Sequence, residues 1–226
     1  MAPLLKITDL KKSFKSPDGQ MNPVINIDSF ELDNESEVAL IGRSGTGKST
    51  FLNIICGILN PDAGEVVVKE TAITSLKESQ KDRFRAQRIG YIFQTFNLLQ
   101  NFTALENVLI GMRFAGKVNR QKAEEILQKV GLGDRIDYKP SQLSTGQQQR
   151  VAVARALVNE PDLVIADEPT GNLDPEHAAS AMALIRDLCK ENKASLLVVS
   201  HEKELINSFD RVEELSKINL VGAASC

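Results

Sequence analysis

The stretch GRSGTGKST, residues 42–50, decides the fold of this chain. It matches the pattern G-x-x-x-x-G-K-[ST] at Gly42, Gly47, Lys48 and Ser49. Glycines let backbone N–H groups surround phosphate oxygens, and the positive end of a helix dipole attracts the same negative charge. The stretch therefore predicts a phosphate-binding loop that joins a strand to a helix.

The flanking sequence gives this loop the context that it needs. EVALIG, residues 37–42, reads as a buried strand, and a helical pattern follows over residues 48–59. The alternative is an ordinary glycine-rich turn, which the matched positions and their context disfavour. We expect Lys48 to reach the β- and γ-phosphates of a nucleotide and Ser49 to offer its hydroxyl to Mg²⁺. Every residue of the loop is a candidate for nucleotide contact: Gly42, Arg43, Ser44, Gly45, Thr46, Gly47, Lys48, Ser49 and Thr50.

Two carboxylates end another apolar run. LVIADE, residues 163–168, reads as a buried strand that closes with Asp167 and Glu168. The C-terminal ends of parallel strands border the crevice in which α/β proteins bind ligands. We expect Asp167 to hold Mg²⁺ through water and Glu168 to orient or deprotonate the attacking water. Strands often end in charged residues, so the pair gains its meaning from the phosphate-binding loop.

The stretch LSTGQQQR, residues 143–150, opens an apolar helical run. Ser144 and Gln147 fit the capping-box pattern, in which each side chain bonds an N–H group that the helix leaves without a partner. Such a cap explains two residues, but it gives no reason for Gly146. The stretch is therefore either a helix cap alone or a cap that also faces an anion.

The order of strands and helices predicts an α/β fold. Short apolar runs with turn signals over the first 35 residues indicate antiparallel hairpin strands, and later strands alternate with helices, which favours a mostly parallel sheet. From residue 103 to 158 the pattern is helical throughout. We therefore expect one domain, with an N-terminal antiparallel β subdomain and an all-helical insertion. The core spans residues 4–93 and 161–221, and the insertion spans residues 94–160.

Composition narrows the class of partner. The chain has 226 residues and a net charge of −3, and no run of basic residues stands out. Proteins that bind duplex nucleic acid usually carry a basic stripe, so we expect no nucleic-acid partner. No stretch reaches the ~20 apolar residues of a membrane span. We expect a soluble chain whose role at a membrane, if it has one, depends on a partner.

The stretch LSTGQQQR resembles the signature motif, usually LSGGQ, of the ABC ATPases. Further elements of that family follow in order along the chain. Phe14 lies where the family has an aromatic residue that stacks on adenine, and Gln94 matches the loop glutamine that links the magnesium site to the helical insertion. Asp174 in NLD matches the D-loop, and His201 in VVSHE matches the switch histidine. The resemblance covers residues 4–215 and implies the fold of the P-loop nucleotide hydrolases.

The resemblance also implies a mechanism in which two copies of the chain enclose two ATP molecules head to tail. Each signature helix then points at the γ-phosphate that the other copy holds. Ser144 would donate to that phosphate, Gly146 would permit close approach of the backbone, and Gln147 would support the loop. Thr145 replaces a family glycine; its N–H group can still contact phosphate, but its branched side chain restricts the backbone.

Within the site, the resemblance implies that Ser49, Gln94 and Asp167 surround Mg²⁺. Lys48, Gln94, Glu168 and His201 would take part in hydrolysis, and Asp174 would lie at the nucleotide. ATP and Mg²⁺ are therefore the expected cofactors.

Three stretches, RSGTGKST, YIFQTFNLLQNFTALENV and DEPTGNLD, look most like cassettes of the lipoprotein-releasing, macrolide-exporter and cell-division group. Such cassettes work with integral membrane permease subunits, so we expect this chain on the cytoplasmic face of the inner membrane. The region Gln94–Phe102 would dock the permease. Its residues Phe96, Leu98, Leu99 and Phe102 are apolar on a loop that should be exposed, unless they pack within the helical insertion.

Two other classes of function stay open. A soluble ABC ATPase of DNA repair or translation would favour a second cassette, a long coiled coil or a basic surface, and none is visible. An ATP-gated module without hydrolysis is disfavoured because the expected base, Glu168, is present.

Overall fold

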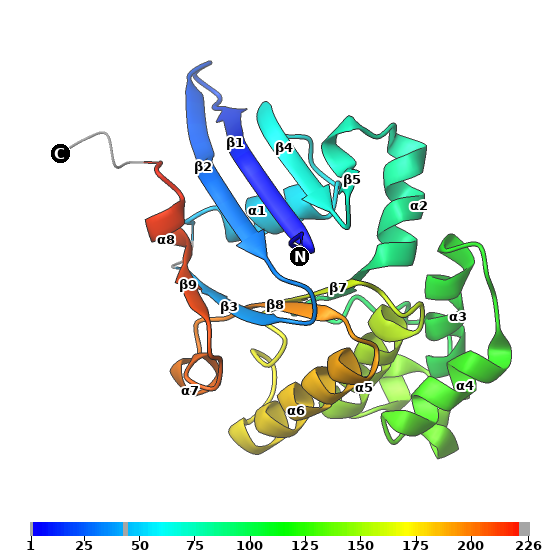
Figure 1. Cartoon of the computed structure of the whole chain (residues 1–226). Coiled ribbons are helices and arrows are strands. Elements are labelled where there is room, and N and C mark those ends of the chain that lie inside the picture. Colours follow the sequence, from blue (N-terminus) through cyan, green and yellow to red (C-terminus); the bar gives the residue numbers. More distant parts are fainter. Residues whose placement is uncertain (1, 43–44, 222–226) are drawn as a thin grey trace. The chain divides into compact units, whose positions relative to one another are not determined.

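The protein is seen here as a computed structural model that describes residues 2–42 and 45–221, except the side chains of Pro175, Lys203 and Glu204 (Figure 1). Arg43 and Ser44, which the sequence assigns to the phosphate-binding loop, lie outside the described residues. The chain divides into two compact units. The first comprises Met1–Lys81 and Val199–Cys226, and the second comprises Asp82–Val198.

The first unit contains an antiparallel sheet in the strand order β2-β1-β4-β5 (Figure 1). A tight turn joins the first two strands: the N–H of Ser16 donates to the carbonyl of Gln20 over 2.8 Å, and Gly19 has a φ of 88°. This conformation favours glycine, as the sequence PDG at this turn predicts. The strands are β1 (Leu5–Lys15), β2 (Met21–Leu32), β4 (Ala63–Val68) and β5 (Thr71–Ala72).

The first unit also contains the strand and helix that flank the phosphate-binding loop. Strand β3 (Glu37–Ile41) pairs in parallel with β9 (Val212–Glu214), and helix α1 (Lys48–Ile55) follows the loop. This helix is shorter than the pattern predicts, because Cys56 caps it and Gly57 turns the chain with a φ of 65°. The remaining elements are η1 (Ile73–Ser75), α2 (Glu78–Arg88), which continues into the second unit, α7 (Lys203–Ile206) and α8 (Leu215–Ile218).

The second unit is built on parallel strands in the order β6-β7-β8, and the pairing of β6 with β7 is parallel. The five residues of β8 are all buried, and so are the first four of β7. Continuous burial is typical of a parallel sheet with both faces covered. The strands are β6 (Ile89–Ile92), β7 (Leu163–Asp167) and β8 (Ser195–Val199).

The helical region that the sequence predicts falls within the second unit. Two 3₁₀ turns, η2 (Gly133–Arg135) and η3 (Pro140–Gln142), interrupt it. Thr103 begins the first helix with the expected capping box, because its side chain accepts from the N–H of Glu106 while that glutamate bonds back. The helices of this region are α3 (Ala104–Phe114), α4 (Arg120–Lys129) and α5 (Thr145–Leu157). Helix α6 (Pro175–Glu191) follows β7. The limits of the insertion, residues 94–160, stay a prediction.

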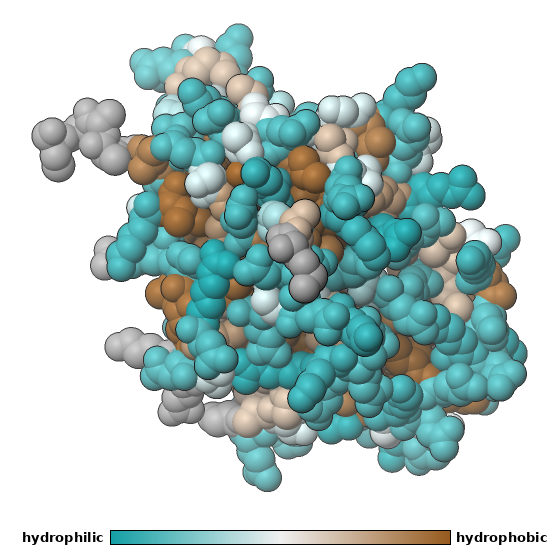
Figure 2. Space-filling view, in the orientation of Figure 1, coloured by the Kyte–Doolittle hydropathy of each residue, from teal (hydrophilic) through white to brown (hydrophobic). Residues whose placement is uncertain are grey.

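The elements confirm the predicted combination of an antiparallel sheet, parallel strands and helices. On the face shown in Figure 2, hydrophilic residues predominate and hydrophobic residues lie scattered between them. Across residues 2–42 and 45–221, no helix is both long enough and apolar enough to cross a membrane.

Candidate functional site

Two glycines of the phosphate-binding loop lie where a side chain would collide. A Cβ atom on Gly42 would lie 2.7 Å from the Oγ1 of Thr46. A Cβ atom on Gly47 would lie 3.0 Å from the carbonyl oxygen of Val24 and from the Cδ1 of Ile25, and the φ of Gly47 is 92°. Gly47 needs to be glycine because of its φ and its contact with β2, whereas a side chain on Gly42 would force the Thr46 side chain to move.

The amino end of α1 is suited to an anion. Its N-cap is Gly47, which has no side chain to bond the first N–H groups, and its first turn contains no acidic residue. The N–H groups and the helix dipole therefore favour an external negative charge. Lys48 lies in the same turn, and its Nζ donates to the carbonyl of Gly42 over 2.6 Å. This bond holds the ammonium group within the loop.

Phe14 lies near the end of β1, opposite Asn22 of β2. Its side chain is exposed, and the Nζ of Lys12 lies 5.7 Å from the centre of its ring. Because this ring on β1 is exposed, it can stack on a base, which is compatible with the predicted contact with adenine.

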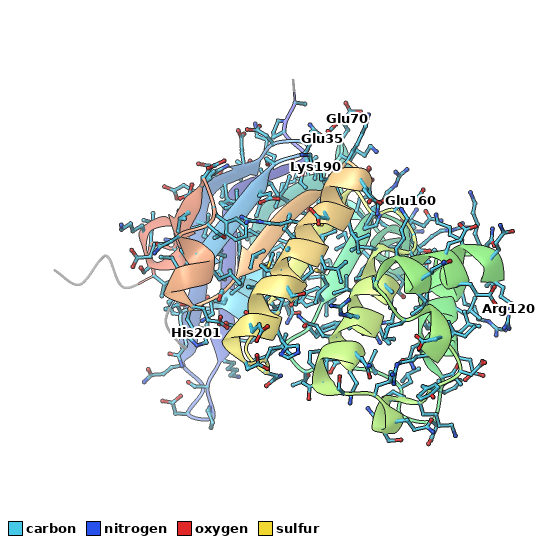
Figure 3. The ribbon with its side chains drawn as sticks, turned by 90° about the horizontal axis from the view of Figure 1, so that it is seen from below. Glu35, Glu70, Arg120, Glu160, Lys190 and His201 are labelled. Atoms are coloured by element: carbon cyan, nitrogen blue, oxygen red, sulfur yellow. The ribbon has the colours of Figure 1, made fainter. Side chains whose placement is uncertain are left out.

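His201 follows β8 and is exposed; Figure 3 labels its side chain. Hydrogen bonds fix the backbone on both sides of it. The N–H of Ser200 donates to the carbonyl of Leu40 over 3.3 Å, and the N–H of Glu202 donates to the hydroxyl of Ser200 over 3.1 Å. The histidine therefore stands on an anchored segment of the first unit.

In the second unit, Asp167 is the last residue of β7 and Glu168 follows it directly. Asp167 is partly buried, and its Oδ2 accepts from the hydroxyl of Tyr91 over 3.3 Å. Glu168 is 9% exposed and has a φ of 47°, which is a strained conformation for a residue with a side chain. A turn holds it there, because the carbonyl of Glu168 accepts from the N–H of Gly171 over 3.2 Å. This turn thus fixes the backbone of Glu168 directly after β7.

Gln94 lies at the same edge of the parallel sheet. The register pairs Ile92 with Ala166, so the chain leaves both strands side by side and Gln94 follows β6 as Glu168 follows β7. The amide of Asn172 donates to the carbonyl of Gln94 over 2.6 Å. This bond joins the loop after β6 to the loop after β7.

The signature stretch is a helix cap, as the capping-box pattern predicts. Ser144 is the N-cap of α5: its hydroxyl accepts from the N–H of Gln147 over 3.3 Å, and its N–H donates to the side chain of Gln147 over 3.0 Å. Thr145 is the first residue of the helix and has no positive φ. Its restricted backbone therefore causes no strain here.

Nothing within its own unit requires a glycine at position 146. It has no positive φ, and a Cβ atom on it would meet only the Cδ2 of His177, at an ordinary distance of 3.7 Å. Three following side chains bond to backbone carbonyls: Gln148 to Leu143, Gln149 to Pro169 and Arg150 to Val130. These bonds indicate that the three residues have a structural role and do not contact the nucleotide.

Asp174 is the N-cap of α6 and accepts from the N–H of His177 over 3.2 Å. The ring Nδ1 of His177 lies 2.7 Å from the Oδ2 of the same aspartate. This hydrogen bond lowers the pKa of Asp174 and raises the pKa of His177 above its usual value. Both side chains are exposed, so the predicted contact of Asp174 with nucleotide is sterically open.

Arg155 is a residue that the motifs missed. Its Nη2 donates to the carbonyl of Phe96 over 2.6 Å and its Nη1 to the carbonyl of Asn97 over 2.7 Å. Both of these residues have positive φ, 58° and 49°. Burial lowers the pKa of the guanidinium. A charge inside the apolar run VAVARALV was the signal that could have revealed it, since a buried charge needs partners.

The prediction that the apolar residues of the loop after Gln94 are exposed is correct only in part. Phe96 and Leu98 are each only 7% exposed, so the expectation that they face solvent is wrong, whereas Leu99 and Phe102 are exposed. The reason is the fully buried side chain of Asn107, whose Oδ1 accepts from the N–H of Leu99 over 2.8 Å and whose Nδ2 donates to the carbonyl of Phe102. These bonds fold the loop onto α3.

These features recur together in one known family. The sequence model of the family described as ABC transporter matches residues 25–171, more than half of the chain. The chain belongs to the ATP-binding cassettes of the ABC transporters. The match begins in β2 and includes the phosphate-binding loop, the signature stretch and the carboxylates that end β7.

Two similar curated proteins carry the same name. The lipoprotein-releasing system ATP-binding protein LolD of Saccharophagus degradans is 43% identical over 216 residues, which cover 94% of each chain. The protein of the same name from Idiomarina loihiensis is 41% identical over 215 residues, again 94% of each chain.

Solved structures share the fold. The dimeric structure of a post-hydrolysis state of the ATP-binding cassette MJ0796 bound to ADP and Pi is similar with a TM-score of 0.84. Its sequence is 34% identical, and the match covers 93% of each chain. A second structure, the dimeric MJ0796 described as a bacterial ABC transporter cassette, gives the same values. The chain is thus an ABC-type ATPase with a P-loop α/β fold.

We predict that Arg155→Ala releases the turn after Gln94. The substitution removes two charged hydrogen bonds to Phe96 and Asn97, so the free energy of unfolding should fall by about 2–4 kcal/mol. Amide hydrogen exchange near residues 95–99 should accelerate. Arg150→Ala is the matched control, because it removes a bond from the same helix to Val130 and should deprotect that region instead. Unchanged exchange at residues 95–99 would contradict the role of Arg155.

Proposed function

We propose that this cassette is the ATP-hydrolysing subunit of a membrane complex of the lipoprotein-releasing type and that it works as a head-to-tail dimer. The carrying observation is Gly146. Neither its φ nor its surroundings require glycine, whereas Gly47 has a φ of 92° and packs closely against Val24 and Ile25. A glycine that neither the backbone conformation nor the packing of its own chain requires is suited to a surface that another molecule approaches closely. The dimeric relative with ADP and Pi supports the same reading.

ATP binding is assigned to the first unit and to the signature stretch of a second copy. The N–H groups from Gly42 to Thr50 would surround the phosphates, with Lys48 at the β- and γ-phosphates. Phe14 would stack on the base, since its ring is exposed on β1. These residues offer the donors and the aromatic face that a nucleoside triphosphate needs.

Mg²⁺ is the expected metal, and the residues fit it. Mg²⁺ prefers oxygen ligands and is usually held by one or two carboxylates together with substrate phosphates. Ser49 offers an exposed hydroxyl, and Asp167 and Gln94 offer side-chain oxygens at one edge of the parallel sheet. When bound, the ion supplies charge neutralisation for the transferred phosphoryl group. We assign the ion to these three residues.

Glu168 is assigned as the residue that orients or deprotonates the attacking water. It follows β7 directly, with a left-handed backbone and low exposure. Lys48 would stabilise the charge of the phosphate oxygens, and His201 would contact the γ-phosphate from its anchored segment. Gln94, tied to Asn172, would report the state of this site to the loop that follows.

The dimer completes the site. Ser144 uses only its oxygen as an acceptor in the helix cap, so its hydroxyl hydrogen is available for the γ-phosphate held by the second copy. Gly146, Gln147 and the N–H of Thr145 would line the same contact, because α5 points its amino end at the phosphate. Asp174, at the start of α6, would lie at the edge of this interface.

The membrane partner is assigned to the loop Gln94–Phe102. Leu99 and Phe102 are 43% and 41% exposed and supply an apolar contact for a permease subunit. The loop is joined to the ATP-hydrolysis segment through Asn172 and to α5 through Arg155. Contact at this loop would thus reach the turn after Glu168 through the bond between Gln94 and Asn172. The chain would work at the cytoplasmic face of the membrane that holds the permease.

We predict that Glu168→Gln lowers ATP turnover by at least about 10²-fold, because the amide cannot take a proton from water. The variant should form a stable dimer in ATP, measurable by size-exclusion chromatography with light scattering. Glu160→Gln is the matched control: Glu160 also has a positive φ of 51°, but it is an exposed residue paired with Lys122. Wild-type turnover in Glu168→Gln would remove this residue from its role.

We predict that mixing two inactive chains restores hydrolysis. Ser144→Arg blocks the signature surface, and Lys48→Ala disables the phosphate-binding loop. A mixed pair contains one intact loop facing one intact signature stretch, so the mixture should hydrolyse ATP well above either variant alone. A mixture as inactive as its components would contradict the head-to-tail arrangement.

We predict that the double substitution Leu99→Glu and Phe102→Glu removes the cassette from its membrane complex while basal ATPase activity persists. Charges at an apolar contact oppose desolvation. The measurement is recovery of the permease in a pull-down from solubilised membranes. Met21→Glu, at a residue 60% exposed in the first unit, is the control and should retain the permease. Recovery of ribosomes or DNA by the wild-type chain would instead favour a soluble ABC ATPase.

A further inference from the structure

Asn219 lies directly after α8, is only 7% exposed and binds three backbone groups. Its Nδ2 donates to the carbonyl of Val24 over 2.8 Å and to the carbonyl of Thr46 over 3.3 Å. Its Oδ1 accepts from the N–H of Asn26 over 2.7 Å. A side-chain amide carries two N–H donors, and here each has a carbonyl partner. The residue therefore connects β2 with the phosphate-binding loop.

The neighbours of Asn219 hold it in this position. The N–H of Leu220 donates to the carbonyl of Asn26 over 2.7 Å, and the N–H of Asn219 donates to the carbonyl of Leu215 over 2.8 Å. Leu215 is fully buried, and its Cβ lies 3.4 Å from the position of a Cβ on Gly42. The segment with α8 thus packs beside β2 and against the start of the loop (Figure 1).

The bond to Thr46 has a consequence for the next residue. The carbonyl of Thr46 and the N–H of Gly47 belong to one planar trans peptide, so they point in opposite directions. Glycine gives this peptide little conformational restraint of its own. An amide that holds the carbonyl therefore aims the N–H of Gly47 away from Asn219, and a fixed N–H is what a phosphate oxygen requires.

We propose, on the basis of the ATP site assigned above, that Asn219 is a positioning residue for the phosphate-binding loop: it holds the Thr46–Gly47 peptide so that the Gly47 N–H faces the nucleotide. The same side chain binds two residues of β2, the strand whose Asn22 lies opposite Phe14. Asn219 thus connects the phosphate-binding loop to β2, the strand that pairs with β1 near Phe14. Its loss should weaken nucleotide binding more than it slows the chemical step.

The test is Asn219→Asp, which keeps the shape and replaces the two donors by a carboxylate oxygen. That oxygen faces the carbonyls of Val24 and Thr46 and repels both. Isothermal titration of the full chain with ATP in the presence of EDTA measures affinity without turnover. We expect the dissociation constant to rise at least about tenfold, the loss expected for one or two hydrogen bonds.

Asn159→Asp is the matched control. The amide of Asn159 also donates to two carbonyls, those of Ala86 and Gly111, at 3.0 Å each, but it lies in the second unit. The same substitution there removes the same kind of bonds and should leave ATP affinity within about twofold of wild type. Equal losses in the two variants would show a general structural effect and would overturn the positioning role.

Two further variants separate the possible failures. Asn219→Ser keeps one hydroxyl donor and is the milder change if Asn219→Asp does not fold; its affinity should fall by at least about threefold. Lys48→Ala tests the site itself and should abolish ATP binding. Unchanged binding in Lys48→Ala would refute the assigned ATP site. Lost binding there with wild-type binding in both Asn219 variants would refute only the role of Asn219.

Discussion

The close contact between Gly47 and β2 is the constraint on which the nucleotide end of this cassette depends. A Cβ atom at this position would lie 3.0 Å from the carbonyl oxygen of Val24, so only glycine lets the loop approach the strand. The contact places the amino end of α1 beside a strand whose partner carries the aromatic Phe14. Asn219 bonds the same two elements, so packing and hydrogen bonding act on one geometry.

In the second unit, helix α5 has the corresponding organising role. Gln149, Arg150 and Arg155 project from it to backbone carbonyls of three different segments. Each bond satisfies a carbonyl that no strand or helix uses, which is why these turns can adopt left-handed or irregular conformations. The helix whose amino end carries the signature stretch therefore also holds the loop proposed for the permease. A rigid helix that joins two contact surfaces is a simple mechanical link between them.

The glycines of the two predicted phosphate contacts differ in their physical reason. Gly47 is required by its own chain because of its positive φ and its contact with β2, and a side chain on Gly42 would collide with Thr46. Gly146 is not required in this way, since it has an ordinary φ and open surroundings apart from His177. The proposed assembly of two copies would account for this difference, because a second molecule would then approach Gly146. Thr145 fits the same view: it suits the first turn of α5, and only its N–H needs to face outward.

The sequence alone determined the phosphate-binding loop, the carboxylates after β7, the cap at Ser144 and the family, because each rests on residue types at fixed spacing along the chain. It also predicted most elements, since their apolar periods are local properties. Only the tertiary structure decided the burial of Phe96 and Leu98 and the roles of Arg155 and Asn219. The roles of Arg155 and Asn219 depend on backbone carbonyls that lie 58 to 195 positions away in sequence. No local pattern encodes such a partner, because hydrogen bonds to the main chain do not depend on which residue supplies the carbonyl.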